Sequence, residues 1–219
     1  MTDAAPPSWP ISWVGRLHGS LVFGRRTRVL AELLAQQLPP AASVLDVGCG
    51  DGTVASLMKK LRPDISVQGI EISPRATCRI PSTAYNGKSF PFPDSSVDIC
   101  MFVDVLHHTP DIAVMLREAC RTCRVGVLIK DHLSESWWDN QALRVMDWVG
   151  NRPHGVAIPA NYQCLAKWKD DFQSCQLATA SWTAQVPLYP FPVSLVCGRH
   201  LHFVAFLRKG VATQASAVR

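Results

Sequence analysis

The stretch VLDVGCGDGT, residues 44–53, decides the fold of this chain. It opens with apolar residues of the kind that form a buried strand, then places glycine at every second position, and a helical pattern follows from Thr53. Glycine adopts backbone angles that other residues avoid, and its missing side chain lets a ligand approach the main chain closely. A strand, a glycine turn and a helix in this order predict the first half of a βαβ unit with a ligand-binding loop.

Acidic residues on both sides of the glycines indicate the charge of the ligand. Dinucleotide sites use the pattern G-x-G-x-x-G to rest a pyrophosphate on a helix N-terminus, but here the third glycine comes one residue early and Thr53 takes its expected position. Asp46 and Asp51 would repel a phosphate, whereas they suit an ammonium or a sulfonium group. We therefore expect a cationic ligand.

A further acid indicates that the ligand carries a sugar. Glu71 follows a second predicted strand at 66–70, where a carboxylate accepts hydrogen bonds from both hydroxyls of a ribose. The other interpretation of these residues is a tight turn beside a solvated acid. The strand context, the flanking acids and the position of Glu71 together favour a nucleoside site.

The rest of the chain alternates between helix and strand patterns. The segment Thr109-Pro110-Asp111 predicts a helix start, with Thr109 as the N-cap and Pro110 as the first helical residue. We expect helices at 21–38, 53–61, 110–123 and 163–174, and strands at 43–47, 66–70, 97–103, 126–130, 178–186 and 200–207. The last two strands should form an antiparallel pair. This order predicts the α/β class with a doubly wound sheet.

Composition excludes several classes of protein. The 219 residues are 47% hydrophobic and 18% charged, which is typical of a globular chain rather than a disordered or fibrous one. The net charge of +5 includes one local basic cluster, Arg25, Arg26 and Arg28, which is too small to predict nucleic-acid binding. The eight cysteines are scattered, and no second cysteine or histidine pair completes a zinc site with Cys120 and Cys123. We expect reduced thiols.

The length of 219 residues predicts one domain over residues 1–219. No apolar run approaches the roughly 20 residues that cross a bilayer, and the first residues lack the layout of a secretory signal. We expect no membrane span and a cytoplasmic location. Residues 1–40 should form an N-terminal helical cap, and residues 134–162 an insertion that covers the substrate.

Four segments in order carry a family resemblance. VLDVGCGDGT at 44–53, GIEIS at 69–73, FPFPDSSVDICMFVDVLHHTPD at 90–111 and GVLIKDHL at 126–133 resemble successive motifs of class I S-adenosylmethionine-dependent methyltransferases, in the branch that acts on small molecules and quinones. The resemblance implies a mostly parallel seven-stranded sheet of order 3-2-1-4-5-7-6, with strand 7 antiparallel and helices on both faces.

The same resemblance implies S-adenosyl-L-methionine as cofactor and S-adenosyl-L-homocysteine as product. The residues at the family's cofactor-binding positions are Asp46, Gly48, Gly50, Asp51, Gly52, Glu71, Ile72, Asn86, Gly87, Val103 and Asp104. One position departs from the pattern, since relatives usually have an aspartate where this chain has Asn86. An asparagine oxygen still accepts a hydrogen bond from the adenine amino group, although without the assistance of charge.

Candidate bases gather where the fourth and fifth strands end. Substrates enter doubly wound sheets at the carboxyl ends of the strands, and a base is needed where the methyl acceptor retains its proton. His132 is the first choice, with Asp131 or another nearby acid to orient its ring, and Asp131 and His108 are further catalytic candidates. His107 is expected to contact the substrate.

Aromatic residues of the insertion predict a substrate wall. Trp137, Trp138 and Tyr162 belong to this wall, and His18 of the N-terminal segment faces it from the other side. The other interpretation is that the tryptophans form ordinary core. His200 and His202 alternate on a predicted strand without an evident third ligand, so no metal site is expected.

These observations predict methyl transfer to a small, aromatic or hydroxyl-bearing metabolite, with oxygen favoured over nitrogen or carbon. The alternatives are an RNA or protein methyltransferase and a non-catalytic protein that binds S-adenosylmethionine beside a partner. The expected partners are a small-molecule acceptor and no nucleic acid, and the expected assembly is a monomer or homodimer. The identity of the acceptor and the methylated atom stay open.

Overall fold

The fold is given by a computed structural model that describes residues 13–151, 161–189, 191, 194 and 198–210. Helices are α1 (Trp13–Gln37), α2 (Thr53–Leu61), η1 (Leu106–His108), α3 (Ile112–Thr122), α4 (Trp137–Asn151), α5 (Leu165–Ser174) and η3 (Arg199–Leu201). Strands are β1 (Ser43–Val47), β2 (Ser66–Glu71), β3 (Ser82–Ala84), β4 (Val97–Val103), β5 (Cys123–His132), β6 (Leu177–Ala184) and β7 (His202–Lys209).

One sheet contains these strands in the order β3-β2-β1-β4-β5-β7-β6. The strands from β3 to β5 pair in parallel, and β7 runs antiparallel to both of its neighbours, β5 and β6. The predicted α/β class, strand order and antiparallel seventh strand are confirmed. The short edge strand β3 was expected from the family's strand order rather than from its own sequence pattern.

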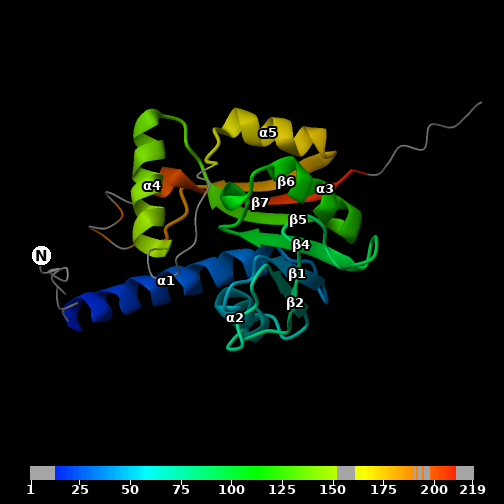
Figure 1. Cartoon of the computed structure of the whole chain (residues 1–219), viewed down its shortest axis with the longest axis horizontal. Coiled ribbons are helices and arrows are strands. Elements are labelled where there is room, and N and C mark those ends of the chain that lie inside the picture. Colours follow the sequence, from blue (N-terminus) through cyan, green and yellow to red (C-terminus); the bar gives the residue numbers. More distant parts are fainter. Residues whose placement is uncertain (1–12, 152–160, 190, 192–193, 195–197, 211–219) are drawn as a thin grey trace, which may run out of the picture.

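Helices cover both faces of the sheet, and each face has its own apolar core. Figure 1 shows α1 and α2 on one face and α3 and α5 on the other. Buried residues of α1 and α2 pack on Val44 and Met101, while those of α3 and α5 pack on Leu45 and Phe102. Successive side chains of a strand point to opposite faces, which explains why β1 and β4 are apolar almost throughout. Helix α4 stands beside the end of the sheet where β4 and β5 finish (Figure 1).

Several element boundaries differ from the prediction. The N-cap of α3 is Asp111, whose Oδ1 accepts a hydrogen bond from the Val114 amide at 3.2 Å, and not Thr109. The Thr109 hydroxyl instead donates to the Leu106 carbonyl at 2.7 Å and closes η1. At the other end of α3, Cys123 already belongs to β5. Residues 199–201 form η3, so β7 begins at His202 rather than at residue 200.

Two further properties bear on the class of protein. Within the described residues, no helix combines the length and apolar character required to cross a bilayer. The seven cysteines of that part are free thiols, and Cys197 lies outside it.

Candidate functional site

The glycine loop after β1 has the conformation that its sequence predicts. Gly48 and Gly50 have φ angles of 71° and 57°, in the left-handed region that other residues avoid. A Cβ on Gly48 would lie 2.7 Å from a methyl carbon of Val105, so a side chain does not fit there. A Cβ on Gly50 would meet no atom within 4 Å. The main chain at Gly50 is therefore open to a ligand.

Two acids stand beside this loop. Glu71, at the end of β2, accepts hydrogen bonds from the amides of Gly50 and Ile72 at 2.9 and 2.8 Å. Asp46, in β1, is 4% exposed. Burial and the nearby Glu71 raise the pKa of Asp46 to about 8, so its carboxyl group is mostly protonated at neutral pH in the free protein. A ligand with positive charge would favour the ionised form of this group.

The remaining predicted cofactor residues surround the same loop with different roles. Asp51 accepts hydrogen bonds from the amide and hydroxyl of Thr53, the first residue of α2, at 3.0 and 2.7 Å, and the N-cap of this helix is Gly52. Ile72 is exposed, and its terminal carbon lies 3.2 Å from where a Cβ of Gly87 would be. These two residues form an open apolar surface that suits a purine ring.

Asn86 is already engaged in its own turn. Its side-chain oxygen accepts from the amides of Lys88 and Ser89, both at 2.9 Å, and its side-chain nitrogen donates to the Ser89 hydroxyl at 3.1 Å. Asparagine favours such turns because its side chain hydrogen-bonds backbone amides further along the chain. The structure gives Asn86 a turn-forming role, and the predicted adenine contact stays a prediction.

A second group of polar residues lies at the carboxyl ends of β4 and β5. Asp104, which follows β4 beside Val103, has a left-handed φ of 57° and forms ion pairs with Arg26 of α1 and Lys130 of β5. Lys130 is 0% exposed. Burial opposes ionisation of Asp104, but Lys130 and Arg26 hold its pKa well below the usual range. The carboxylate predicted to flank the methionine group is thus engaged by two cations of the protein.

His107 of η1 bridges two further carboxylates. Its Nδ1 lies 2.6 Å from Oδ1 of Asp131, and its Nε2 lies 3.3 Å from Oδ2 of Asp147 in α4. Tyr162 donates its hydroxyl to Asp147 and stacks on the His107 ring with centroids 5.4 Å apart. Burial disfavours the charged ring, but Asp131 and Asp147 raise the pKa of His107 to about 10. These carboxylates favour the protonated form of His107, with Nδ1 within hydrogen-bond distance of Asp131.

Three other histidines of this region favour the neutral state. Burial and Lys130 lower the pKa of His132 well below its usual value and that of His202 to about 2. Burial and the charged His107 lower the pKa of His108.

The Asp131 carboxylate also accepts hydrogen bonds from the amides of Leu106 and His132, at 3.0 and 2.8 Å, and its side chain faces His107. The acid beside the His132 ring is Asp104, with Oδ1 3.4 Å from Nε2. Of the two expected orienting groups, Asp131 or another nearby acid, the geometry therefore favours the second, Asp104.

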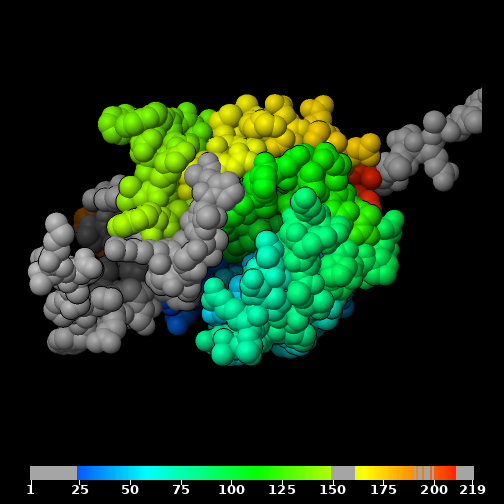
Figure 2. All heavy atoms as spheres, viewed as in Figure 1, coloured from blue at the N-terminus to red at the C-terminus, as the bar shows by residue number. Residues whose placement is uncertain are grey.

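The predicted aromatic wall divides into two parts. Tyr162 joins the polar cluster, whereas Trp137 and Trp138 are 64% and 76% exposed. They pack on each other, with centroids 4.6 Å apart, on the outer surface of α4, which forms a ridge at one end of the molecule (Figure 2). The structure does not bring these tryptophans to the cluster. The His18 side chain lies outside the described part of the chain.

Sequence reasoning missed four members of the cluster: Arg26, Lys130, Asp147 and His202. Two of them carry a sequence signal, since Lys130 directly follows the buried apolar run 127–129 of β5 and His202 directly precedes the buried apolar run 203–207 of β7. A charged residue in such a strand requires a partner. Arg26 and Asp147 carry no such signal, because their partners come from distant parts of the chain.

Two sets of residues have metal-ligand chemistry. Ligand atoms of His107, Asp131 and His132 lie within 4.8 Å of one another, and so do those of His107, His108 and Asp147. Both sets include His107, whose nitrogens face two carboxylates and hold a proton. A metal ion would have to displace that proton, and we assign no metal to either set.

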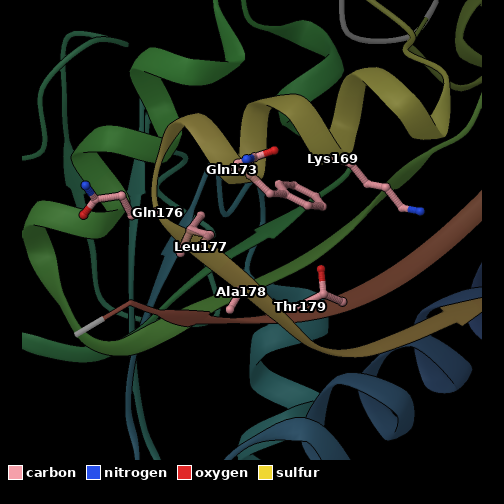
Figure 3. Close-up of a pocket in the computed structure, with 7 residues that line it drawn as sticks. Lys169, Gln173, Gln176, Leu177, Ala178 and Thr179 are labelled. Atoms are coloured by element: carbon pink, nitrogen blue, oxygen red, sulfur yellow. The ribbon is translucent and has the colours of Figure 1, made fainter. Parts of the chain in front are cut away.

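A hollow of about 370 Å³ lies elsewhere, between α5 and the start of β6 (Figure 3). Phe172 and Leu177 form its apolar part, and Lys169 and Gln173 its rim. Leu177 pairs with Lys209 in the sheet, whereas His202 stands at the opposite end of β7. This hollow is therefore separate from the polar cluster.

Comparison with known proteins agrees with this geometry. Residues 22–178 match the family model of a methyltransferase domain. The chain is 34% identical over 122 residues to 27-O-demethylrifamycin SV methyltransferase of Amycolatopsis mediterranei, covering 49% of this chain and 44% of that protein. It is 29% identical over 172 residues to 2-methyl-6-phytyl-1,4-hydroquinone methyltransferase of a Synechocystis species, covering 70% and 52%. The chain thus spans about half the length of these relatives.

A solved structure shows the same fold. Geranyl diphosphate C-methyltransferase of Streptomyces coelicolor, in complex with Mg²⁺, geranyl diphosphate and S-adenosyl-L-homocysteine, aligns with a TM-score of 0.66 at 13% identity. The alignment covers 94% of this chain and 88% of that protein. Since the family match includes the glycine loop, Glu71 and strands β4 and β5, this chain belongs to the methyltransferase-domain family, the class I S-adenosylmethionine-dependent methyltransferases.

Proposed function

We propose that this protein transfers a methyl group from S-adenosylmethionine to a hydroxyl oxygen of a small, preferably aromatic, acceptor. The observation that carries the proposal is His132, a buried neutral histidine at the carboxyl end of β5 with a carboxylate beside one ring nitrogen. Two relatives are named for hydroxyl-bearing acceptors, 27-O-demethylrifamycin SV and a hydroquinone, and the first name supports transfer to oxygen.

The residues around the glycine loop fit the cofactor. Gly48 and Gly50 would let its methionine part approach the main chain, Glu71 would hold the ribose hydroxyls, and Ile72 with Gly87 would support the adenine. Asp46 and Glu71 supply the negative charge that a cationic nucleoside requires. When bound, S-adenosylmethionine supplies an activated methyl group that leaves sulfur as its bond to the acceptor oxygen forms.

His132 then serves as the base for the hydroxyl proton. Its Nδ1 has no hydrogen-bond partner among the described residues, and its Nε2 faces Asp104. The hydroxyl proton passes to Nδ1, and Asp104 stabilises the imidazolium that results. A hydroxyl group becomes strongly acidic once its oxygen gains a methyl group, so a histidine with a lowered pKa is a sufficient base.

The elements around His107 would close the site. Asn161 donates its amide to the His107 carbonyl at 3.0 Å, and Tyr162 and Asp147 contact the His107 ring, so the middle and the C-terminal end of the expected insertion 134–162 meet at η1. This arrangement supports the role of the insertion as a cover that excludes water from the methyl transfer.

The test is a methylation assay with labelled S-adenosylmethionine and a panel of phenols, hydroquinones and alcohols. We expect His132→Asn to bind the cofactor normally and to lose turnover by about 100-fold or more. Glu71→Ala should lose cofactor binding itself. Methylation of RNA or protein substrates in place of every hydroxyl compound, or cofactor binding without any turnover, would contradict the proposal.

A further inference from the structure

His132 and His202 lie side by side on neighbouring strands. They are register partners in the antiparallel pairing of β5 with β7, and their ring centroids are 5.0 Å apart. Side chains of directly opposed residues share one face of a sheet. Both rings are buried, and burial with the nearby Lys130 keeps both neutral. Each ring therefore has one nitrogen with a proton and one without.

Lys130 determines which nitrogen of His202 carries the proton. The Lys130 ammonium lies 3.5 Å from Nδ1 of His202, and an ammonium group donates hydrogen bonds without accepting any. Nδ1 must then be the accepting nitrogen, which leaves the proton on Nε2. This Nε2 is buried and has no hydrogen-bond partner among the described residues. His202 thus offers an unused donor.

Asp104 determines the opposite arrangement in His132. Its carboxylate lies 3.4 Å from Nε2 of His132 and accepts hydrogen bonds without donating any, which favours the proton on that nitrogen. Nδ1 of His132 then carries a bare lone pair, again buried and without a partner in the described part of the chain. The two neighbouring rings therefore offer one acceptor and one donor, both unused.

We propose that these two nitrogens form a two-point site for the acceptor hydroxyl, in which the hydroxyl donates to Nδ1 of His132 while its oxygen accepts from Nε2 of His202. The inference rests on the proposed function and deepens it, because it assigns His202 to acceptor binding and specifies the class of acceptor. A buried polar atom without a partner is costly, and a ligand that supplies both partners removes that cost.

The two-point site selects oxygen over nitrogen. A hydroxyl oxygen has two lone pairs, so one accepts from His202 while the other remains for the methyl group. A neutral amine has a single lone pair, and a hydrogen bond from His202 would occupy the pair that must attack. A carboxylate has no proton for the lone pair of His132. The site therefore takes a neutral phenol or alcohol.

Two substitutions separate acceptor binding from a structural role of His202. His202→Gln places an amide near the position of Nε2 and retains a donor there, whereas His202→Asn places its amide near Nδ1, beside Lys130, and loses that donor. With the best hydroxyl acceptor of the panel, we expect KM to be about three- to tenfold higher in His202→Asn than in His202→Gln, the worth of one hydrogen bond. A higher KM in His202→Gln than in His202→Asn would overturn the inference, because it would show that acceptor binding depends on the contact of His202 with Lys130 and not on the donor at Nε2.

A second measurement does not depend on the acceptor. Nitrogen NMR of the imidazole rings, assigned with the single substitutions, should show both His132 and His202 protonated at Nε2. Methylation of hydroxyl compounds together with a proton on Nδ1 of either ring would overturn the two-point site and leave the proposed function intact. If the protein binds cofactor but methylates none of the hydroxyl compounds, the proposed function fails, and the inference fails with it.

An isosteric pair of acceptors tests the choice of atom. Wild-type protein should methylate 4-methylphenol and leave 4-methylaniline unmodified, because His202 would engage the lone pair of the aniline nitrogen. In His202→Leu, the kcat/KM for the phenol divided by the kcat/KM for the aniline should fall by about tenfold. Equal use of both compounds by the wild-type protein would overturn the inference.

Discussion

The carboxyl group of Asp46 lies in an environment that opposes its charge until a ligand arrives. Burial and Glu71 raise its pKa from 3.8 to about 8, so folding favours the protonated form. Its contribution to the free energy of unfolding therefore becomes more unfavourable as pH rises from about 4 to about 8. Such a group is expected where a cation binds, because the positive charge of the ligand stabilises the ionised carboxylate.

We predict opposite effects of Asp46→Asn on stability and on cofactor binding. The variant should unfold at a higher temperature than the wild type without ligand, with the largest difference above about pH 8, since the asparagine removes a buried carboxylate. Its affinity for S-adenosylmethionine should fall by about tenfold. Thermal unfolding and calorimetry over a range of pH measure both, and lower stability of the variant at high pH would contradict the assignment.

Residues whose role depends on the local chain were easier to predict than those with distant partners. The glycines of the loop and Glu71 follow from a strand, a turn and a strand, and the structure has them in that arrangement. The sequence offered Asp131 or another nearby acid to orient His132, and the side chain of Asp131 faces His107 while Asp104 lies beside the His132 ring. Adjacent residues of a strand point to opposite faces, so this pairing was unfavourable from the start.

At the scale of elements, Asp104 joins α1 to β4 and β5 through Arg26 and Lys130. We predict that Asp104→Asn lowers the free energy of unfolding by about 3–5 kcal/mol, because it leaves the fully buried Lys130 ammonium without its counter-charge. The double variant Asp104→Asn/Lys130→Met should recover much of that loss. Urea unfolding measures both, and equal stability of the single and double variants would contradict this account.

His107 holds α4 to η1 and β5 through Asp147 and Asp131, and its charge gives this contact a pH dependence. Its pKa is raised from 6.5 to about 10, so the stabilisation is complete below about pH 6.5 and is lost as pH rises through about 10. We predict that the difference in melting temperature between the wild type and His107→Gln narrows over this range. If the two melting temperatures differ by the same amount from pH 6.5 to pH 10, His107 does not carry a charge in the folded protein.

Element boundaries show where sequence patterns were insufficient. A proline at the first helical position is common, so Thr109 was a reasonable N-cap for α3, but the Thr109 hydroxyl bonds back to Leu106 and Asp111 caps the helix. The short helix η1 has no periodicity that a pattern search detects. Its position matters for the site, since it brings His107 over β5.

At the scale of the whole molecule, the cofactor should stabilise the fold by binding the native state alone. Ligand at about 100 times its Kd adds roughly 2.7 kcal/mol, which for a chain of this size corresponds to a rise of about 5–10 °C in Tm. We predict that S-adenosylhomocysteine produces such a rise in the wild type and none in Glu71→Ala. A full rise in the variant would mean that Glu71 is not part of the cofactor site.

The overall architecture was predictable because four ordered motifs resemble one family, whose strand order the sheet reproduces. The polar cluster was less predictable, since it combines residues of α1, β5, α4 and β7 that meet only in three dimensions. Its members are charged or polar residues inside apolar strands, or partners of those residues. A lone Lys130 in a buried strand indicates that a partner exists without indicating which residue it is.

The position of β7 between β5 and β6 has a consequence for synthesis of the chain. Because β6 is made before β7 and pairs in the sheet with β7 alone, a ribosome exposes it before its hydrogen-bonding neighbour exists. Until β7 emerges from the exit tunnel, both β6 and the outer edge of β5 are open to pairing with other nascent chains. Translation pauses near this point would lengthen that interval of vulnerability.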